Sequence, residues 1–100
     1  KCAGMEGLLE EAKELLEERP APEVLDAGAI AAVQHVEHYE MAGYGTARSF
    51  AKSLNLSDVA ELLQETLDEE GAADKKLTAI AEDGWLMSGV NSSAQQAANS

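Results

Sequence analysis

Two glutamates one helical turn apart, Glu37 and Glu40, have the spacing in this chain that points most directly to chemistry. At about 100° per residue, both fall inside the apolar stripe of a predicted long helix, together with Val33 and Tyr44. A carboxylate on a buried face is costly unless it is paired, protonated or bound to a metal ion. The spacing therefore predicts that the two carboxylates share a cation.

A second acidic turn lies on the next predicted helix. Glu69 falls inside the apolar stripe of that helix, Glu65 on its edge and Glu70 at its far flank. If the two helices form an antiparallel hairpin, Glu65 and Glu69 can face the first pair of glutamates. Four carboxylates in one apolar layer make an oxygen-rich site suited to Fe, Mn, Mg or Ca. Di-metal carboxylate bundles are built from such inward glutamates.

Structural pairing is the alternative to metal binding. Arg48 and Lys76 lie on the same two stripes and could neutralise the acids. Asp26 also lies on the stripe, but close to the helix start, where a solvated or capping role is expected. The Tyr44 hydroxyl, one turn beyond Glu40, could hold a ligand carboxylate in place, or the ring could simply fill the core.

The remaining reactive side chains carry weaker signals. His35 and His38 lie opposite the apolar stripe and are expected to be exposed, as is Tyr39. Cys2 has no neighbouring His or Asp to activate its thiol, so we expect it to be inert. A single cysteine excludes a disulfide within the chain and favours a reducing, cytoplasmic location.

Hydrophobic periodicity predicts an all-α fold with no strand. The expected helices cover residues 4–19, 22–54 and 58–83, the last two forming a long antiparallel hairpin that the shorter first helix precedes. Asp58 and Glu61 fit a capping box at the start of the third helix. Gly28, Gly43 and Gly45 lie inside the second helix, where we expect them to allow another helix to approach closely.

The chain divides into residues 1–84, a partial helical domain, and residues 85–100, a polar tail. Trp85, Leu86 and Val90 could dock on the bundle, and fraying is expected beyond Val90. The net charge is −12, from 19 acids against 7 bases, which argues against nucleic acid or an anionic membrane as partner. No apolar run is long enough to span a membrane.

Several segments resemble the YciE/YciF family of ferritin-like bacterial stress proteins. The matching motifs are VEHYE at 36–40, YGTA at 44–47 and LLQETLDEE at 62–70, supported by Asp74, residues 76–78, Val90-Asn91 and the opening residues 1–8. The resemblance covers nearly the whole chain and corresponds to the C-terminal part of the family's domain. The family's first two bundle helices would precede Lys1, and they are missing from this chain.

This resemblance implies a ferritin-like four-helix bundle, a di-iron-type carboxylate site and dimeric assembly. Residue by residue, the acids of the last two bundle helices match Glu37, Glu40, Glu65 and Glu69. The bundle would be completed by a second copy of the chain or by the missing helices. The implied function is a stress-response protein with a di-iron or di-manganese centre, whose candidate activities are Fe(II) oxidation and peroxide detoxification. The alternative is a metal-free helical module for structure or dimerisation.

Overall fold

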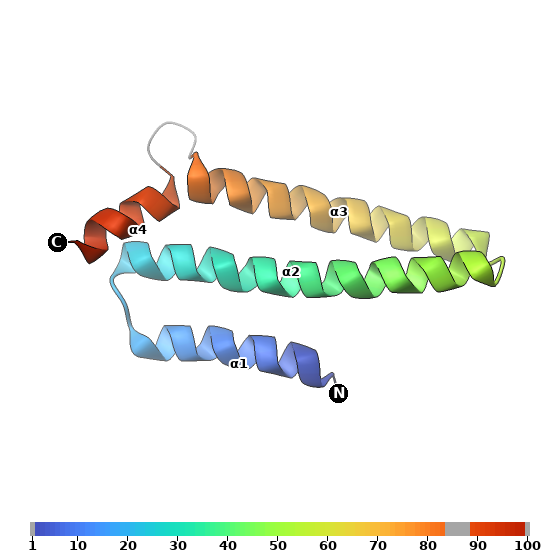
Figure 1. The fold of residues 1–100 in the computed structure, drawn as a ribbon, viewed down its shortest axis with the longest axis horizontal. Coiled ribbons are helices and arrows are strands. Elements are labelled where there is room, and N and C mark those ends of the chain that lie inside the picture. Colours follow the sequence, from blue (N-terminus) through green and yellow to red (C-terminus); the bar gives the residue numbers. More distant parts are fainter. Residues whose placement is uncertain (1, 84–88, 100) are drawn as a thin grey trace.

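Residues 2–83 and 89–99, the part of the chain that the computed structural model describes, fold into four α-helices and no strand (Figure 1). In chain order they are α1 (Ala3–Glu18), α2 (Pro22–Ser53), α3 (Ser57–Glu82) and α4 (Val90–Ala98). The first three begin and end within one residue of the expected bounds, which confirms the all-α prediction and the helical hairpin. Within that part of the chain, no helix combines the length and apolarity that a membrane span requires.

The turn that joins α2 to α3 follows from the conformation of Asn55. Its φ of 61° is left-handed, which asparagine tolerates better than most residues. The Asn55 amide donates to the Lys52 carbonyl oxygen at 3.1 Å. The Leu56 amide donates to the Ala51 carbonyl oxygen at 2.8 Å. These two bonds form a Schellman motif, which satisfies carbonyls that the end of α2 would otherwise leave free.

The start of α3 differs from the sequence interpretation. Its N-cap residue is Leu56, and no side chain caps the first turn. The predicted capping box of Asp58 and Glu61 is therefore wrong. The short turn brings the chain into the helix at Ser57, so Asp58 lies within the first turn, where its charge complements the helix dipole.

The helices form a thin layer in which α2 lies between α1 and α3 (Figure 1). The molecule extends 57 × 33 × 12 Å, and the shortest extent matches the diameter of one helix, about 10–12 Å. The short helix α4 packs against both α2 and α3. The radius of gyration of 16.9 Å exceeds the value of about 13 Å typical of a compact domain of this length.

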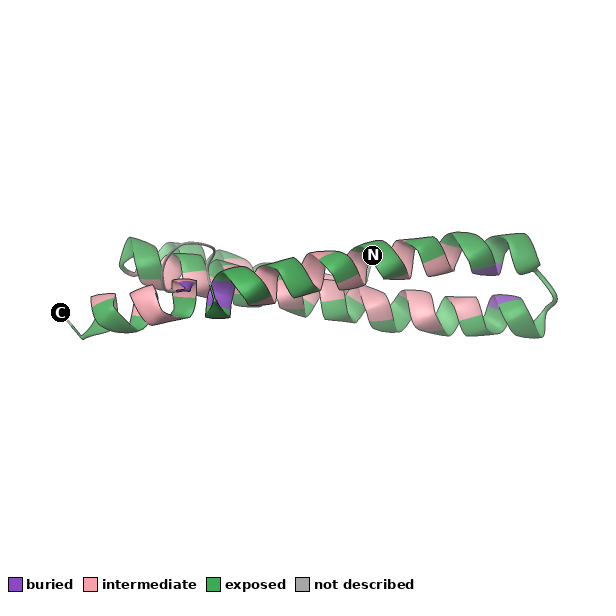
Figure 2. Cartoon of the chain, turned by 90° about the horizontal axis from the view of Figure 1, so that it is seen from above, coloured by how far each residue is buried: buried purple, intermediate pink, exposed green. Residues whose placement is uncertain are grey.

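Burial within this layer is slight (Figure 2). Among the described residues, the buried hydrophobic side chains are Ala51, Ala60 and Ala81. The accessible surface is 7171 Å², whereas a compact protein of this mass exposes about 5,500 Å². The excess reflects the open single-layer arrangement, and large hydrophobic side chains such as Leu54 and Leu62 are among the exposed residues.

Four of the exposed apolar residues, Val33, Leu54, Leu62 and Ile80, lie on one side of the hairpin, which we call the open face. At about 100° per residue, Val33 and Leu54 lie to one side of the α2 contact with α3. Leu62 and Ile80 lie on the same side of the layer because α3 runs antiparallel to α2. Each apolar stripe is therefore wider than the contact between the two helices, and part of it stays exposed.

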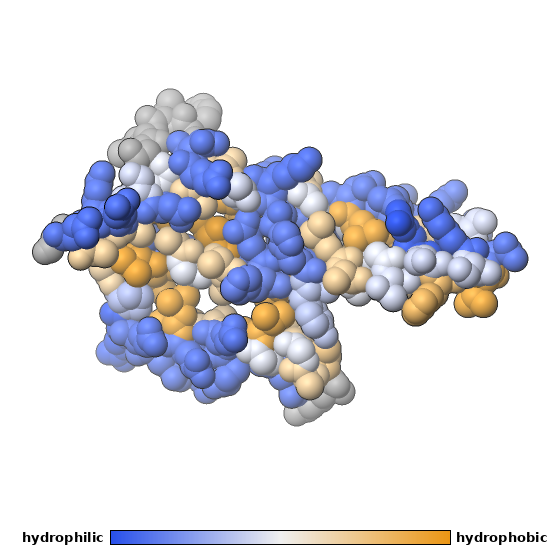
Figure 3. Space-filling model, in the orientation of Figure 1, coloured by the Kyte–Doolittle hydropathy of each residue, from blue (hydrophilic) through white to orange (hydrophobic). Residues whose placement is uncertain are grey.

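Helix α1 approaches α2 at Gly28. A Cβ atom at this position would lie 2.7 Å from Cδ2 of Leu15, which confirms that this glycine permits close approach. Gly43 and Gly45 have no comparable neighbour within 4 Å. Around this contact the two helices pack loosely, because a cavity of about 210 Å³, which Leu15 and Gly28 also line, remains between them. Hydrophobic side chains gather beside this gap, whereas the face of α2 and α3 seen in Figure 3 is mostly hydrophilic.

The tail is more ordered than the sequence predicted. Instead of fraying beyond Val90, the chain forms α4, and Val90, Ser92, Ala94 and Ala97 of this helix are half-buried. Their small side chains allow a short helix to lie close to α2. The predicted docking of Trp85 and Leu86 concerns residues outside the described part of the chain.

Candidate metal centre

The predicted pair of glutamates lies in the middle of α2. Glu37 and Glu40 are both half-buried. The Glu37 Oε2 atom is buried and has no hydrogen-bond partner in the described part of the chain. Buried polar atoms are almost always satisfied, so this oxygen requires a proton, a cation or a group from outside the described residues.

Glu70 joins this pair from α3. The pKa of its half-buried carboxyl is raised, first by burial and then by the negative charges of Glu40, Glu37 and Glu69. Like charges in a partly desolvated place oppose ionisation, and a bound cation would relieve this repulsion. The sequence interpretation placed Glu70 only at the flank of its stripe and left it out of the predicted ligands. The sequence did contain this information: Glu70 lies at the flank of the apolar stripe of α3, and that flank faces α2.

The other two predicted ligands occupy a different position. Glu65 and Glu69 are exposed, one turn apart on α3, on the side of the open face. Of these two residues, only Glu69 contributes to the raised pKa of Glu70. Across residues 2–83 and 89–99, no three His, Cys, Asp or Glu side chains are close enough together to hold a metal ion. The hairpin therefore presents carboxylates on and beside the open face, but not a closed set of ligands.

The groups expected to assist or neutralise these acids are engaged elsewhere or remain free. The Tyr44 side chain is half-buried, and its hydroxyl forms no hydrogen bond with a described glutamate. Arg48 donates from Nη1 to Oε1 of Gln64 instead of pairing with a glutamate. Lys76 is exposed and forms no ion pair with a described carboxylate. The cations of the described residues therefore do not neutralise these acids.

A separate polar cluster crosses the hairpin on the side opposite the open face. His38 Nε2 lies 2.9 Å from Oδ1 of Asp74. Gln34 Nε2 donates to the same oxygen at 3.1 Å and to Oγ1 of Thr78 at 2.8 Å. The histidines are exposed, as expected, but the sequence interpretation missed this cluster because its residues lie outside the apolar stripes. The cluster fixes the register of α2 against α3.

The cysteine has a specific neighbour. Sγ of Cys2 lies 2.7 Å from the hydroxyl of Tyr39. The hydrogen bond with Tyr39 is the main cause of the lowered pKa of Cys2, and the same bond raises the pKa of Tyr39. The two side chains connect the start of α1 to the middle of α2. Gly4 makes room for this contact, because a Cβ there would lie 2.6 Å from the Tyr39 hydroxyl oxygen.

Two long antiparallel helices with half-buried glutamates beside an uncovered apolar face define an all-α layer of the helical-bundle class. The chain belongs to the family described as domain of unknown function DUF892, whose model matches residues 1–95.

A sequence comparison and a structural comparison, both with the E. coli protein YciF, support this assignment and confirm the resemblance seen in the sequence. Protein YciF of Escherichia coli (strain K12) is 54% identical over 81 residues, which cover 81% of this chain and 49% of that protein. The crystal structure of the E. coli stress protein YciF is similar with a TM-score of 0.76 at 45% identity, covering 99% of this chain and 54% of that one. The chain thus spans about half the length of the relatives it matches.

Proposed function

We propose that this chain is one helical layer of a ferritin-like stress-response protein and supplies half of a di-iron or di-manganese carboxylate centre. The observation that carries the proposal is the buried Glu37 Oε2 atom, which has no partner within the described chain and lies beside acids that raise the pKa of Glu70. Carboxylate oxygens are the ligands that hard cations such as Mn²⁺ prefer. A site of this kind favours a divalent cation, because the cation would coordinate the unsatisfied Glu37 oxygen and reduce the repulsion between the carboxylates.

Each acid has a distinct role in this proposal. Glu37 and Glu40 offer oxygens from α2, and Glu70 offers a carboxyl from α3 at the hairpin contact. Glu65 and Glu69 extend the acidic surface towards the open face, where they can meet ligands from another layer. A bound iron or manganese pair would supply redox chemistry suited to Fe(II) oxidation or peroxide removal. The chain itself positions the oxygens and lowers the dielectric around them by partial burial.

The second layer in this proposal is another copy of the same chain. The open face carries Val33, Leu54, Leu62 and Ile80, which are each exposed by at least 46%. Two such layers packed face to face would make four long helices and would double the number of inward carboxylates.

A metal-free structural or dimerisation module is the second candidate. It is favoured by the lack of any metal-competent group of three ligating side chains within residues 2–83 and 89–99. In that case the open face would still join two layers, and the glutamates would be protonated or hydrated at the interface.

The test is metal content and thermal stability of the 100-residue protein, purified without chelator and titrated with Fe(II) under argon or with Mn(II). The Glu37→Gln, Glu69→Gln double variant removes one ligand candidate from each helix. Its matched control is Glu10→Gln, Glu14→Gln, which changes the net charge equally on the exposed side of α1. Light scattering on the same samples measures the oligomeric state.

We expect metal to stabilise the parent and the control against heat, by about 2.7 kcal/mol when free metal is 100 times Kd, and not to stabilise the double variant. A dimer that binds no metal in any sample would support the metal-free module. A monomer without metal would contradict both the centre and the second layer. Equal stabilisation of all three proteins would show non-specific cation binding to an acidic surface.

A further inference from the structure

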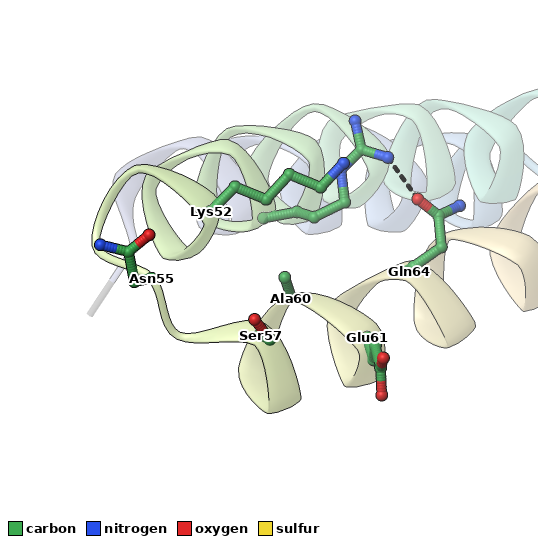
Figure 4. Close-up of a pocket in the computed structure, with 7 residues that line it drawn as sticks. Lys52, Asn55, Ser57, Ala60, Glu61 and Gln64 are labelled. Carbon is green, nitrogen blue, oxygen red and sulfur yellow. Dashed lines mark hydrogen bonds between the residues drawn. The ribbon is translucent and has the colours of Figure 1, made fainter.

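A cavity of about 380 Å³ lies at the tip of the hairpin, between the end of α2 and the start of α3 (Figure 4). It is lined by Arg48, Lys52, Asn55, Ser57, Ala60, Glu61 and Gln64. On the helical wheel, Lys52 lies about 100° from Val33 on α2, and Gln64 lies about 200° from Leu62 on α3. The cavity therefore opens away from the open face, and a second layer packed there would leave it accessible.

The two cations of this cavity, Arg48 and Lys52, lack negatively charged partners among the described residues. Neither Arg48 nor Lys52 forms an ion pair with a carboxylate in the described part of the chain. The Nε atom of Arg48 is buried without a hydrogen-bond partner, although Nη1 of the same side chain donates to Gln64. In a chain with 19 acids and 7 bases, two neighbouring unpaired cations are unexpected. Glu61, the one acid in the lining, does not turn towards them in Figure 4.

Neutral donors complete the lining. The hydroxyl of Ser57 and the side-chain amide of Asn55 both border the cavity. Ser57 is also the first residue of α3, whose first turn has no side-chain cap, so amide groups at the positive end of the helix dipole remain free for a ligand. Asp58 belongs to the same turn and carries an opposing charge, but it does not line this cavity.

We propose that this cavity binds a phosphate-type oxyanion, with Lys52 and Arg48 as the charged donors and Ser57 with the first turn of α3 as the neutral donors. Guanidinium, ammonium and helix-terminal amide groups are the usual partners of phosphate oxygens in proteins. The volume is at the small end of ligand pockets and exceeds what the anion alone fills, so it also has room for a small organic group attached to the phosphate. This site is independent of the proposed metal centre, which lies on other residues.

Isothermal titration calorimetry and amide NMR spectra of the full chain test the proposal, with inorganic phosphate and adenosine monophosphate as probes. We expect saturable binding, with amide shifts concentrated at Ser57, Asp58 and Val59. Lys52→Gln should weaken binding roughly tenfold or more, and Lys52→Arg should retain it, because the side chain is exposed and charge is what it contributes. The control is Lys75→Gln, an exposed lysine that does not line the cavity and should leave the affinity unchanged.

The two probes distinguish the source of the phosphate group. Tighter binding of adenosine monophosphate would support the site as one for a phosphate monoester, and equal affinities would support it as one for the free anion. The proposal is overturned if neither probe binds. It is also overturned if Lys75→Gln weakens binding as much as Lys52→Gln, since binding would then follow net charge alone. Ser57→Ala provides a second variant, for which a weaker affinity with unchanged helical circular dichroism is expected.

Discussion

The middle and the tip of the hairpin are built from the same two helices but differ in which charges lack a partner within the described residues: acids in the middle, and Arg48 and Lys52 at the tip. In the middle, Glu37, Glu40 and Glu70 lie close together, and no cation of the described residues pairs with them. At the tip, Arg48 and Lys52 lie beside a cavity without a described carboxylate partner. The acids and the cations do not neutralise one another because the helix separates them along its axis.

The separation follows from the rise of the α-helix. Glu37 and Arg48 share a stripe, but their positions differ by eleven residues, which amounts to about 16 Å at 1.5 Å per residue. That distance exceeds the Debye length of about 8 Å at physiological ionic strength, so their attraction is largely screened. Two charged regions on one helix can thus remain independent, and each points to a partner outside the chain.

The tip differs from the middle in packing as well, and this difference should produce the largest effect. Ala51 and Ala60 are buried where the two helices close, with exposed fractions of 4% and 5%. Ala51→Leu should lower the free energy of unfolding by about 1–3 kcal/mol, because the larger side chain cannot fit without moving the helices apart. Urea denaturation at fixed protein concentration measures this change.

An exposed alanine provides the control for this comparison. Ala79→Leu on α3 should change the free energy of unfolding by less than about 0.5 kcal/mol, since Ala79 is exposed. If Ala51→Leu is equally harmless, the tip is not closely packed, and the contrast between the two regions loses its structural basis.

The next effect concerns the contact that holds Arg48 at the tip. Its guanidinium donates to Gln64, which in turn donates to Oδ1 of Asp68 at 2.9 Å. Arg48→Met should lower the free energy of unfolding by about 1 kcal/mol, because it removes a charge-assisted hydrogen bond but also removes the unsatisfied Nε atom. The matched variant Lys52→Met should have a smaller effect in the same denaturation assay. A reversed order would mean that Lys52, and not Arg48, stabilises the tip.

The helices could be predicted from the sequence because local signals determine them. The helix ends lie within one residue of those predicted from Pro20 before α2, Pro22 at its first position, apolar residues at helical spacing and Asn55 after α2. The start of α3 was harder to predict from the sequence, because the backbone turn at Asn55, and not the Asp58 side chain, decides where the helix begins. The helix α4 was missed since its small polar residues gain stability only by packing on α2 and α3.

The candidate site was predictable in part. Glu37 and Glu40 stand out because charge interrupts an apolar stripe. Arg48 was considered as their neutralising partner because a helical wheel shows angle and not height, and the axial distance excludes that pairing in the folded hairpin. Glu70 was missed because a stripe by itself does not reveal which of its edges meets the neighbouring helix. That information depends on the tertiary arrangement of α2 and α3.

In the acidic middle of the hairpin, we expect a smaller change in the free energy of unfolding, and this change should depend on pH. The pKa of Glu70 is raised above its ordinary value of 4.5, so its contribution to stability is fully present below pH 4.5 and is lost as the pH rises through the raised value. Glu70→Gln should therefore raise the free energy of unfolding at pH 7, by less than about 1 kcal/mol because solvent screens the repulsion. The gain should shrink as the pH falls towards 4.5.

Thermal denaturation in the presence of a chelator between pH 4.5 and 7 measures this effect. Glu10→Gln on the exposed side of α1 is the control, which removes one negative charge away from the acidic middle of the hairpin. A Glu70→Gln protein that is less stable than the parent at pH 7 would contradict the mutual repulsion of the acids.

The smallest effect lies on the side of α2 that faces α1, within the same middle stretch of the helix. The Tyr39 hydroxyl is the main cause of the lowered pKa of Cys2, so Tyr39→Phe should move the pH at half-maximal thiol alkylation upwards. Iodoacetamide labelling followed by mass spectrometry measures this shift, and Tyr44→Phe serves as a control because Tyr44 does not contact Cys2. Stability should change little, since both groups are exposed and water competes for their hydrogen bond. An unchanged labelling profile would mean that α1 is not held against α2 by this bond in solution.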